Sequence, residues 1–350
     1  MVYKGFWENI KGPIVGLAPM DGVTDAAMRF ITKKHGNPDV VFTEFVSAEG
    51  IRAGAVKLMR DFKYDKIESP VVAQLFGKDP NAFYLATLVV CALGFDGVDI
   101  NMGCPARKVA NRGEGAGLIE TPKLAVEIIK ETKKAVDDWV SGVSLEDKGV
   151  YNKIVDYIVS VGESGVVERK KIPVSVKTRV GYSKPVTEDW IKVLLSSEPA
   201  VISLHGRTLK QGYGGLADWK EIKKAAELCK KTDTLLLGNG DIGSVEDGKK
   251  KIKKYGGDGF LVGRASFGNP WVFVKNMGEV EVKERLKVAL EHAEKFEEYY
   301  PDDRFLAVRK HLSWYAKGFD DASELRRKLV VCNSASEVKK VLKEGGSLYT

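Results

Sequence analysis

Val98-Asp99-Ile100-Asn101-Met102-Gly103-Cys104-Pro105 is the stretch around which the chain is organised. A short apolar run ends here in an amide, a glycine and a thiol. Pro105 stops the run because it has no backbone N–H to donate, and Gly103 lets the backbone turn sharply beside Cys104. The pattern predicts a buried strand that delivers an amide and a thiol to a rim. An isolated Cys is more often a buried structural residue than a reactive one, so other parts of the sequence are needed to distinguish these two roles.

The composition is typical of a soluble globular protein. A chain of 350 residues accommodates one α/β barrel plus an appendage. The apolar fraction of 44% and the charged fraction of 29% indicate a sizeable core. No apolar run approaches membrane-spanning length, and residues 1–7 lack the apolar core of a signal peptide. We therefore expect a cytoplasmic protein with no membrane partner.

The cysteines and the net charge exclude some function classes. Cys91, Cys104, Cys229 and Cys332 are scattered and form no Cys-x-x-Cys pair, which argues against a zinc site and against a disulfide framework. We expect no metal. The net charge of +7 permits a polyanionic partner without demanding one.

Up to about residue 275 the sequence repeats one pattern, a short apolar run followed by a loop and an amphipathic helix. Several runs are continuously apolar, as is typical of parallel strands covered by helices. Eight strand–helix units predict an α/β fold of the (β/α)8 TIM-barrel class; a doubly wound open sheet is the alternative, with usually fewer strands. The predicted strands are residues 14–18, 40–43, 71–75, 97–101, 174–177, 200–204, 235–238 and 259–262.

Helix signals fall between the predicted strands. Thr121 followed by Pro122 predicts a capped helix with proline at its first position. Ser244 with Asp247 resembles a capping box, and the lysine-rich helix that follows is expected to end at Gly256.

Two segments stand outside the repeat. Residues 137–171 lengthen one connection and contain apolar residues at helical spacing, which predicts one inserted helix. From about residue 281 the strand pattern stops and amphipathic stripes begin. We therefore expect a barrel domain over residues 1–275 and a small all-helical C-terminal domain over residues 281–350.

Nearly every predicted strand ends in a polar or small residue. In a TIM barrel the chemistry lies at the C-terminal ends of the strands, so these residues are brought to the same rim. Core packing alone does not explain so many polar strand ends. In chain order they include Asp21, Glu44, Gln74, Asn101, Lys177, Arg179, His205, Arg207, Asn239, Asp241 and Arg264.

The two turns after the seventh and eighth predicted strands are typical of phosphate-binding loops. Barrels of this class commonly hold phosphate there with backbone N–H groups. Asn239, Gly240 and Gly263 fit such a cradle, with Arg264 available for a charge-assisted contact. Two ordinary turns are the alternative, because glycine is common in turns.

Lys177 and His205 are the other candidates for chemistry. Lys177 is compatible with a Schiff-base lysine, a phosphate ligand or a cation that holds the anionic ring of a cofactor. His205 is one of only four histidines, and its place beside Lys177 and Arg207 favours a functional role over a structural one.

Together these segments closely resemble the tRNA-dihydrouridine synthase family, FMN enzymes with a TIM-barrel fold. The resemblance covers about residues 12–330, and its most specific part is the Asn-Met-Gly-Cys-Pro run at residues 101–105. The other matching segments are residues 18–25, 73–75, 112–113, 176–179, 204–208, 238–241, 263–264, 268–271 and 309–311.

The resemblance implies a set of flavin-binding residues. FMN would lie across the barrel mouth, and a cation at the polar edge of its ring would stabilise the reduced, anionic flavin. Asp21 stands where relatives usually carry a small residue, and it would place a carboxylate near the flavin edge. The implied set is Pro19, Met20, Asp21, Gln74, Lys177, His205, Asn239, Gly240, Asp241, Gly263 and Arg264.

The resemblance also implies a reaction. NADPH would reduce the flavin, which would pass hydride to C6 of a uracil, and Cys104 would donate the proton at C5, since an unperturbed thiol is mostly protonated near neutral pH. Asn101 would position the uracil. The RNA partner would be held by Arg107, Lys108 and Arg112 beside the Cys104 loop and by Arg179 and Arg207 on the rim.

A uridine in folded tRNA has to be extruded to reach a barrel mouth, so the surrounding RNA needs a grip. The helical tail offers basic residues for it, such as Arg309 and Lys310, although a solvated helix face is the alternative because its basic and acidic residues nearly balance. We expect a monomer, since no self-complementary apolar face is evident. The modified position and the choice between NADPH and NADH stay open.

Three alternatives compete with this interpretation. A dihydroorotate-dehydrogenase-like FMN barrel that acts on a free pyrimidine does not explain the helical tail and the basic rim. An RNA-binding protein without turnover does not explain Cys104, Lys177 and His205 together. A flavin-free aldolase that uses Lys177 would contain no FMN. Glu114 and the 137–171 insertion also depart from the family pattern, which leaves the substrate position open.

Overall fold

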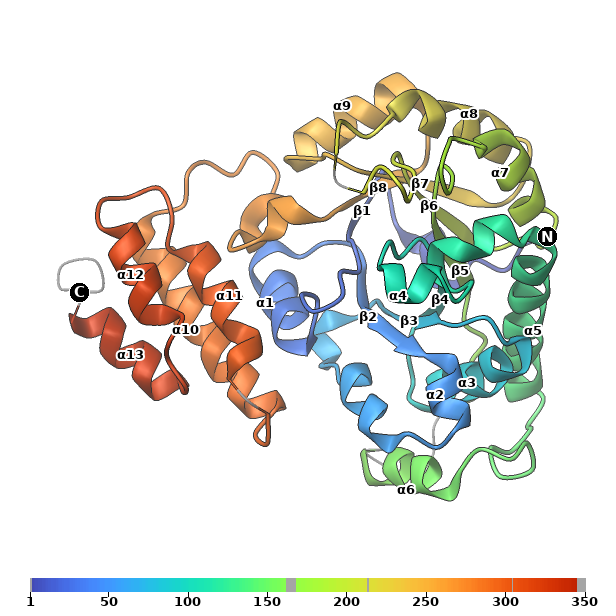
Figure 1. Cartoon of the computed structure of the whole chain (residues 1–350), viewed down its shortest axis with the longest axis horizontal. Helices are drawn as coiled ribbons and strands as arrows, with labels where there is room; N and C mark the ends of the chain where they lie inside the picture. The colour runs from blue at the N-terminus through green and yellow to red at the C-terminus, as the bar shows by residue number, and fades with distance from the viewer. Residues whose placement is uncertain (1, 162–167, 213, 304, 345–350) are drawn as a thin grey trace.

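Eight parallel strands form the centre of the molecule (Figure 1). The structure is a computed structural model that describes residues 2–161, 168–212, 214–303 and 305–344. The strands pair in the order β1-β8-β7-β6-β5-β4-β3-β2. They are β1 (Ile14–Leu17), β2 (Val41–Ser47), β3 (Val71–Phe76), β4 (Gly97–Met102), β5 (Val174–Arg179), β6 (Val201–His205), β7 (Leu235–Asn239) and β8 (Gly259–Val262).

The sheet closes on itself between its two outermost strands. The N–H of Leu17 donates to the carbonyl of Val40 at 3.0 Å, beside a parallel bridge between Gly16 and Val40. A Cβ at Gly16 would lie 2.6 Å from Leu261 and 2.8 Å from Val40, so glycine is what allows this close approach. The predicted TIM-barrel class is confirmed.

Helices wrap the outside of the barrel (Figure 1). Their apolar faces pack on the outward side chains of the strands in one large buried cluster, as parallel sheets require. The helices of this part are α1 (Ala26–Gly36), α2 (Ala48–Arg52), α3 (Pro80–Ala92), α4 (Arg107–Ala110), α5 (Pro122–Val140), α6 (Asn152–Val161), α7 (Thr187–Leu195), α8 (Trp219–Cys229) and α9 (Val245–Tyr255). Single 3-10 turns cover Gly5–Asn9, Val56–Phe62, Lys66–Glu68, Gly115–Glu120, Arg264–Ser266 and Pro270–Phe273.

The helix signals in the sequence are correct in some details and wrong in others. The Ser244 hydroxyl accepts the N–H of Asp247 at 3.1 Å, and Gly256 ends α9 as predicted. Pro122 is the first residue of α5, but the Thr121 side chain makes no capping hydrogen bond. The inserted helix in 137–171 is α6, and residues 162–167 of that segment lie outside the described residues.

Apolar side chains fill the bottom of the barrel. Val72, Val201, Leu237 and Leu261 come from four different strands and pack together in one buried cluster with Trp7, which is only 2% exposed. Burying an aromatic side chain of this size contributes about 2–3 kcal/mol. This cluster closes the N-terminal end of the barrel, so only the opposite end is left for a site.

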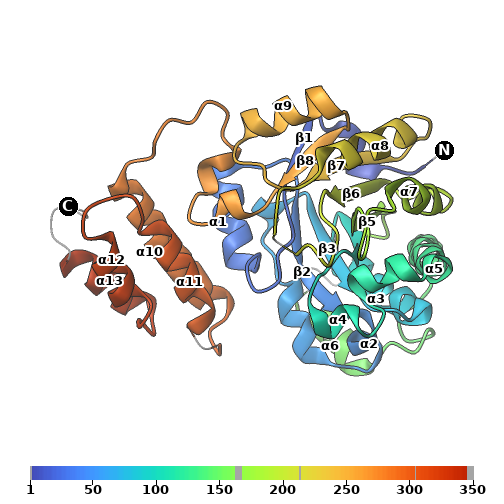
Figure 2. The ribbon, with the colours of Figure 1, turned by 45° about the horizontal axis from the view of Figure 1, so that its top comes forward.

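Four helices follow the barrel, and the first of them packs against α1, whereas the last two lie on the side away from it (Figures 1 and 2). Their buried cluster includes Phe30 and Ile31 of α1, so the two parts share a core. Lys63 donates to the carbonyl of Tyr299 at 2.6 Å, and Arg60 pairs with Asp303 at 2.7 Å. The four helices are α10 (Val282–Tyr299), α11 (Leu306–Tyr315), α12 (Ala322–Leu329) and α13 (Ala335–Glu344).

No helix in the described ranges is both long enough and apolar enough to cross a membrane.

Candidate functional site

A cavity of about 1070 Å³ opens at the carboxyl ends of the strands. Most of the residues predicted to act at the barrel rim line it, together with apolar residues that the sequence did not single out. The predicted residues in its wall are Pro19, Met20, Asp21, Asn101, Cys104, Lys177, Arg179, His205, Arg207, Asn239, Gly240, Asp241, Gly263 and Arg264. The size suits a nucleotide-sized ligand.

Among the predicted residues whose side chains the structure describes, Gln74, Lys108 and Arg112 do not line this cavity. Gln74 is buried inside the barrel and is only 1% exposed. Lys108 and Arg112 are exposed, and Arg107 is the first residue of α4. The segment that follows Cys104 contains α4 and a 3-10 turn, where a loop was expected, and Lys78 fixes it by donating to the carbonyl of Arg112 at 3.0 Å.

Cys104 lies in the cavity wall directly after β4. The side-chain oxygen of Asn101 accepts the backbone N–H of Cys104 at 2.8 Å and that of Gly103 at 3.1 Å, which fixes the turn that carries the thiol. The thiol is free and 8% exposed. Burial raises the pKa of Cys104 above its ordinary value, and the Asp21 carboxylate raises this pKa further. The thiol is therefore protonated at neutral pH and available as a proton donor.

Lys177 places a partly buried cation in the wall of the same cavity. Its ammonium lies 3.4 Å from the side-chain oxygen of Asn239, and it forms no ion pair with any residue that the structure describes. Burial, together with the Arg179 guanidinium, lowers the pKa of Lys177 to about 8. Burial and the surrounding cations also lower the pKa of His205 far below its ordinary value, so His205 is neutral at pH 7.

Asp241 connects three loops at the mouth of the cavity. Its carboxylate accepts from Arg207 at 2.7 Å, from Arg264 at 2.9 Å and from the N–H of Ala217 at 2.8 Å. Arg207 and Ala217 follow β6, Asp241 follows β7 and Arg264 follows β8. These contacts hold the pKa of Asp241 below its ordinary value, against the effect of burial. Asp241 therefore organises the loops that were predicted to bind phosphate.

The two arginines that were expected on the rim to hold RNA are buried in the cavity wall instead. Arg179 is 4% exposed and Arg207 is 2% exposed, so neither crowns the rim. The Nε of Arg179 donates to the carbonyl of Gly103 at 2.7 Å, and Arg207 pairs with Asp241. Both side chains form part of the cavity wall because acceptors from neighbouring loops bind them there.

Sequence reasoning missed a polar network beneath the cavity. Asp99 and Ser175 are buried inside the barrel beside Gln74, and the Asp99 carboxylate accepts hydrogen bonds from Ser175 and from Gln74. The signal was present: a charged residue interrupts an otherwise apolar strand two positions before Asn101, and residues two apart share one face of a strand.

Phe267 is another lining residue that the sequence did not single out. Its ring stacks on Trp314 of α11, with centroids 4.1 Å apart and planes 9° apart. The mouth of the barrel is thereby in contact with the helical region.

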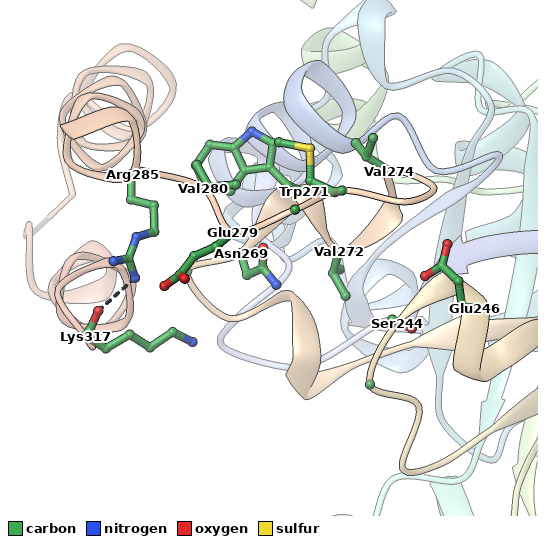
Figure 3. Close-up of a pocket in the computed structure, with 14 residues that line it drawn as sticks. Ser244, Glu246, Asn269, Trp271, Val272, Val274, Glu279, Val280, Arg285 and Lys317 are labelled. Carbon is green, nitrogen blue, oxygen red and sulfur yellow. Dashed lines mark hydrogen bonds between the residues drawn. The ribbon is translucent and has the colours of Figure 1, made fainter. Parts of the chain in front are cut away.

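A second cavity of about 270 Å³ lies between the barrel and the helical region (Figure 3). Gly243 lines both cavities, so the two adjoin. Arg285 and Lys317 approach it from the helical side, and Arg285 donates to the carbonyl of Lys317 at 2.8 Å. The Nε of Arg285 is buried without a hydrogen-bond partner among the described residues. Burial lowers the pKa of Lys317, and the neighbouring Arg285 contributes.

Within the described ranges, no group of three or more His, Cys, Asp or Glu side chains could hold a metal ion.

Fold and cavity together define an α/β-barrel protein that can take a nucleotide-sized ligand at the carboxyl ends of its strands. The model of the dihydrouridine synthase family matches residues 16–168 and 151–346. A probable tRNA-dihydrouridine synthase of Staphylococcus aureus (strain MRSA252) is 33% identical over 348 residues, which cover 97% of this chain and 95% of that protein. The chain therefore belongs to the dihydrouridine synthase family, as the sequence predicted.

Two further comparisons agree with this result. A probable tRNA-dihydrouridine synthase 2 of Bacillus subtilis (strain 168) is 33% identical over 347 residues, which cover 97% of this chain and 96% of that protein. The crystal structure of DHODH in complex with ferulenol from Eimeria tenella aligns with a TM-score of 0.50 and 13% identity over 81% of each chain. The latter likeness shows a shared fold alone.

Proposed function

We propose that this protein reduces uridine in tRNA to dihydrouridine, with FMN as its flavin and NADPH as the source of electrons. The observation that carries the proposal is that one nucleotide-sized cavity has two groups in its wall, the protonated thiol of Cys104 and the partly buried ammonium of Lys177, which forms no ion pair among the described residues. Membership of the dihydrouridine synthase family supports the reaction class.

The residues around the cavity fit FMN. The partly buried Lys177 ammonium forms no ion pair among the described residues, so it favours an anion beside it, and the reduced isoalloxazine ring is one. A Cβ at Gly263 would meet its nearest neighbour only at 3.6 Å, so the backbone there is open to a phosphate. Arg264 keeps 53% of its side chain exposed beside that backbone. Lys177 would therefore hold the ring, while Gly263 and Arg264 would hold the phosphate.

Bound FMN, once reduced by NADPH, supplies the hydride that C6 of the uracil receives. The protein supplies the other half of the reduction, because charge that develops at C5 is neutralised by the proton on the Cys104 Sγ. Asn101 has both Gly103 and Cys104 N–H groups on its side-chain oxygen, so it sets the position of the thiol while facing the substrate. Lys177 stabilises negative charge on the ring.

The RNA surrounding the reacting base needs its own contacts. A base that reacts inside a barrel has to be flipped out of its stack, and single-stranded or loop RNA is held by phosphates and by stacking. We assign this task to the helical domain, residues 281–350, and to Arg107, Lys108 and Arg112 near the mouth. The barrel, residues 1–275, carries the chemistry. Because the proposed substrate is tRNA, we also propose a cytoplasmic location.

The test is an anaerobic flavin experiment. Purified protein is reduced with NADPH, and flavin absorbance is followed after addition of tRNA that lacks dihydrouridine. We expect rapid reoxidation with this tRNA and none with fully modified tRNA or with orotate. Reoxidation by orotate but not by tRNA would mean that the substrate is a free pyrimidine. Protein that never binds FMN would overturn the proposal.

Variants separate the thiol from the flavin in the same assay. Cys104→Ala should keep reduction by NADPH and slow reoxidation by tRNA by about 10²–10⁴-fold, the usual contribution of a general acid. Cys91→Ala removes an equally buried thiol from α3 and should reoxidise at the parental rate. Equal rates of reoxidation by tRNA in both variants would mean that Cys104 is not the proton donor.

A further inference from the structure

We infer that Asp99 is a positioning residue that fixes the Cys104 turn through the side-chain amides of Gln74 and Asn101. The inference rests on the proposed function, in which Cys104 is the proton donor. Asp99 itself lies below the cavity and does not line it.

Strand register brings the members of this network together. Gln74 on β3 is the direct partner of Asp99 on β4, and Asp99 is the direct partner of Ser175 on β5. Paired residues on neighbouring strands point to the same side of a sheet. Asn101 follows Asp99 by two positions, so it points to that side as well. Asp99, Gln74 and Ser175 are at most 2% exposed.

The hydrogen bonds run in one direction only. Asp99 accepts from Ser175 Oγ at 2.6 Å and from Gln74 Nε2 at 2.7 Å. An ionised carboxylate has no proton to donate, so the NH₂ group of Gln74 has to face Asp99. The opposite end of that amide, Oε1, then accepts from Asn101 Nδ2 at 2.8 Å.

The same logic carries the direction on to Cys104. Because the NH₂ group of Asn101 donates to Gln74, the side-chain oxygen of Asn101 faces the backbone N–H groups of Gly103 and Cys104. A flipped Asn101 would present an NH₂ group to two N–H donors. Asp99 is the one acceptor-only side chain in this hydrogen-bonded series, so it fixes the orientation of Gln74, while the N–H groups of Gly103 and Cys104 fix that of Asn101 from the other end.

Asp99 stays ionised at neutral pH although burial disfavours its charge. Burial raises the pKa of Asp99 to about 6, and the hydrogen bonds from Ser175 and Gln74 and the nearby Lys177 ammonium limit that rise. The Asp99 carboxylate therefore interacts with the Lys177 ammonium, which is also the cation proposed to hold the flavin ring. This location explains why a barrel strand carries a fully buried acid.

Substitutions at Asp99 test whether it acts through direction of hydrogen bonding. Asp99→Leu removes the acceptor, so Gln74 is free to rotate and Asn101 loses the fixed oxygen that holds its NH₂ group. Asp99→Asn keeps an oxygen for Gln74, while its NH₂ group donates to Ser175 Oγ, whose hydrogen turns to the carbonyl of Val98 at 3.4 Å. The leucine variant should lose the fixed turn, and the asparagine variant should restore it.

The readout is alkylation of Cys104 by iodoacetamide in protein free of flavin and RNA, followed by peptide mass spectrometry across pH 6–10. With the turn released, we expect Asp99→Leu to alkylate Cys104 about tenfold faster and with a shifted pH profile, the usual effect of one lost hydrogen bond to a buried group. Asp99→Asn should stay within about threefold of the parent, by the same conversion of free energy to rate. Ser203→Ala removes a buried hydroxyl without a described partner from the barrel interior, and it should change nothing.

A second variant covers the case in which Asp99→Leu does not fold. Gln74→Met breaks the same series of hydrogen bonds at the next residue, so it should release Cys104 to the same extent. Alkylation of Cys104 in the double variant should be no faster than in either single variant. Additive effects, an unchanged alkylation profile, or an asparagine variant as reactive as the leucine variant would overturn the inference. The alkylation experiment contains neither tRNA nor flavin, so its result does not depend on whether the proposed reaction is correct.

Discussion

Burial acts in opposite directions on the two ionisable side chains that the proposed chemistry needs. It raises the pKa of Cys104 and so keeps the thiol protonated, whereas it lowers the pKa of Lys177 to about 8, because a low-dielectric environment disfavours whichever form is charged. One thiol that holds its proton and one ammonium close to losing its proton therefore face the same cavity. The window in which both are protonated ends near pH 8.

This difference predicts the pH dependence of flavin binding. Lys177 carries its charge below about pH 8 and loses it above, so FMN affinity should fall as the pH rises. If the ammonium form alone binds the ring well, the dissociation constant rises about tenfold from pH 7 to pH 9. Fluorescence titration measures it. Lys177→Met should bind weakly with no step in this range.

Lys33 provides the matched control for this experiment. It is also buried with a lowered pKa, but it donates to the carbonyl of Pro38 outside the cavity. Lys33→Met should keep the step near pH 8. A step that survives in Lys177→Met would assign the titration to another group.

The residue types of the site were predictable from the sequence, but the directions of long side chains were not. Cys104, Lys177 and His205 lie where the strand ends placed them. Arg179 and Arg207 turn inward because the carbonyl of Gly103 and the carboxylate of Asp241 accept from them. Those acceptors come from other loops, and their distance in space is not encoded in any local pattern.

At the scale of elements, the strands were predictable because each is a short apolar run between turn signals. Seven predicted strands end within two residues of their observed ends. The exception is β2, which was expected to end at Thr43 and continues to Ser47. A register shift between Phe42 and Phe45 accommodates Glu44, after which pairing with β3 resumes. A bulge of this kind breaks the apolar run without ending the strand.

The three loops around Asp241 form an element whose stability can be measured. Asp241→Asn keeps the side-chain shape, and asparagine tolerates the left-handed backbone at φ 49°. It removes the charge that pairs with the buried Arg207 and with Arg264. Because Asp241 is partly in contact with water, we expect the free energy of unfolding to fall by about 2 kcal/mol, less than for a fully buried pair. FMN should also bind more weakly.

Asp39 is the control at the other end of the barrel. Its carboxylate accepts the N–H of Val15 at 2.8 Å and has no part in the mouth. Urea unfolding and FMN titration should show weaker flavin binding for Asp241→Asn and parental binding for Asp39→Asn. Equal flavin affinity in both variants would mean that the loops do not depend on the carboxylate.

At the scale of the whole molecule, the core of the helical region contains two buried histidines. The rings of His292 on α10 and His311 on α11 lie 4.7 Å apart, and both nitrogens of His311 are buried without a partner among the described residues. Burial lowers the pKa of His292 to about 3 and that of His311 far below its ordinary value. Both are therefore neutral in the folded protein.

This pair predicts acid sensitivity of the helical region. Below the unfolded pKa of about 6.5, the unfolded chain binds protons that the folded chain does not, so stability is intact above that pH and falls below it. Between pH 6.5 and pH 5 each histidine costs about 2 kcal/mol. His311→Phe should reduce the loss of melting temperature from pH 7 to pH 5, and an equal loss in this variant and in the parent would contradict the prediction.

The cavity between the barrel and the helical region predicts where RNA outside the active site is held. Arg285 and Lys317 approach it from the helical side, and it adjoins the active-site cavity at Gly243. If a tRNA phosphate occupies it, Arg285→Ala with Lys317→Ala should raise the KM for tRNA and leave kcat within a few-fold. The slope of log affinity against log salt should fall by about two, one for each lost phosphate contact.

Net charge alone would also weaken RNA binding, so the comparison needs a variant with the same charge loss elsewhere. Lys339 and Lys340 lie exposed on α13, which both ribbon views place on the side of the helical region away from the barrel (Figures 1 and 2). Lys339→Ala with Lys340→Ala removes two charges there. A larger rise in KM for the Arg285 and Lys317 pair assigns a phosphate to the cavity. An equal rise in KM in both double variants would mean that Arg285 and Lys317 act only by long-range attraction and bind no phosphate in the cavity. Exposed charges anywhere on the surface contribute to such attraction, because RNA responds to the field of the whole surface.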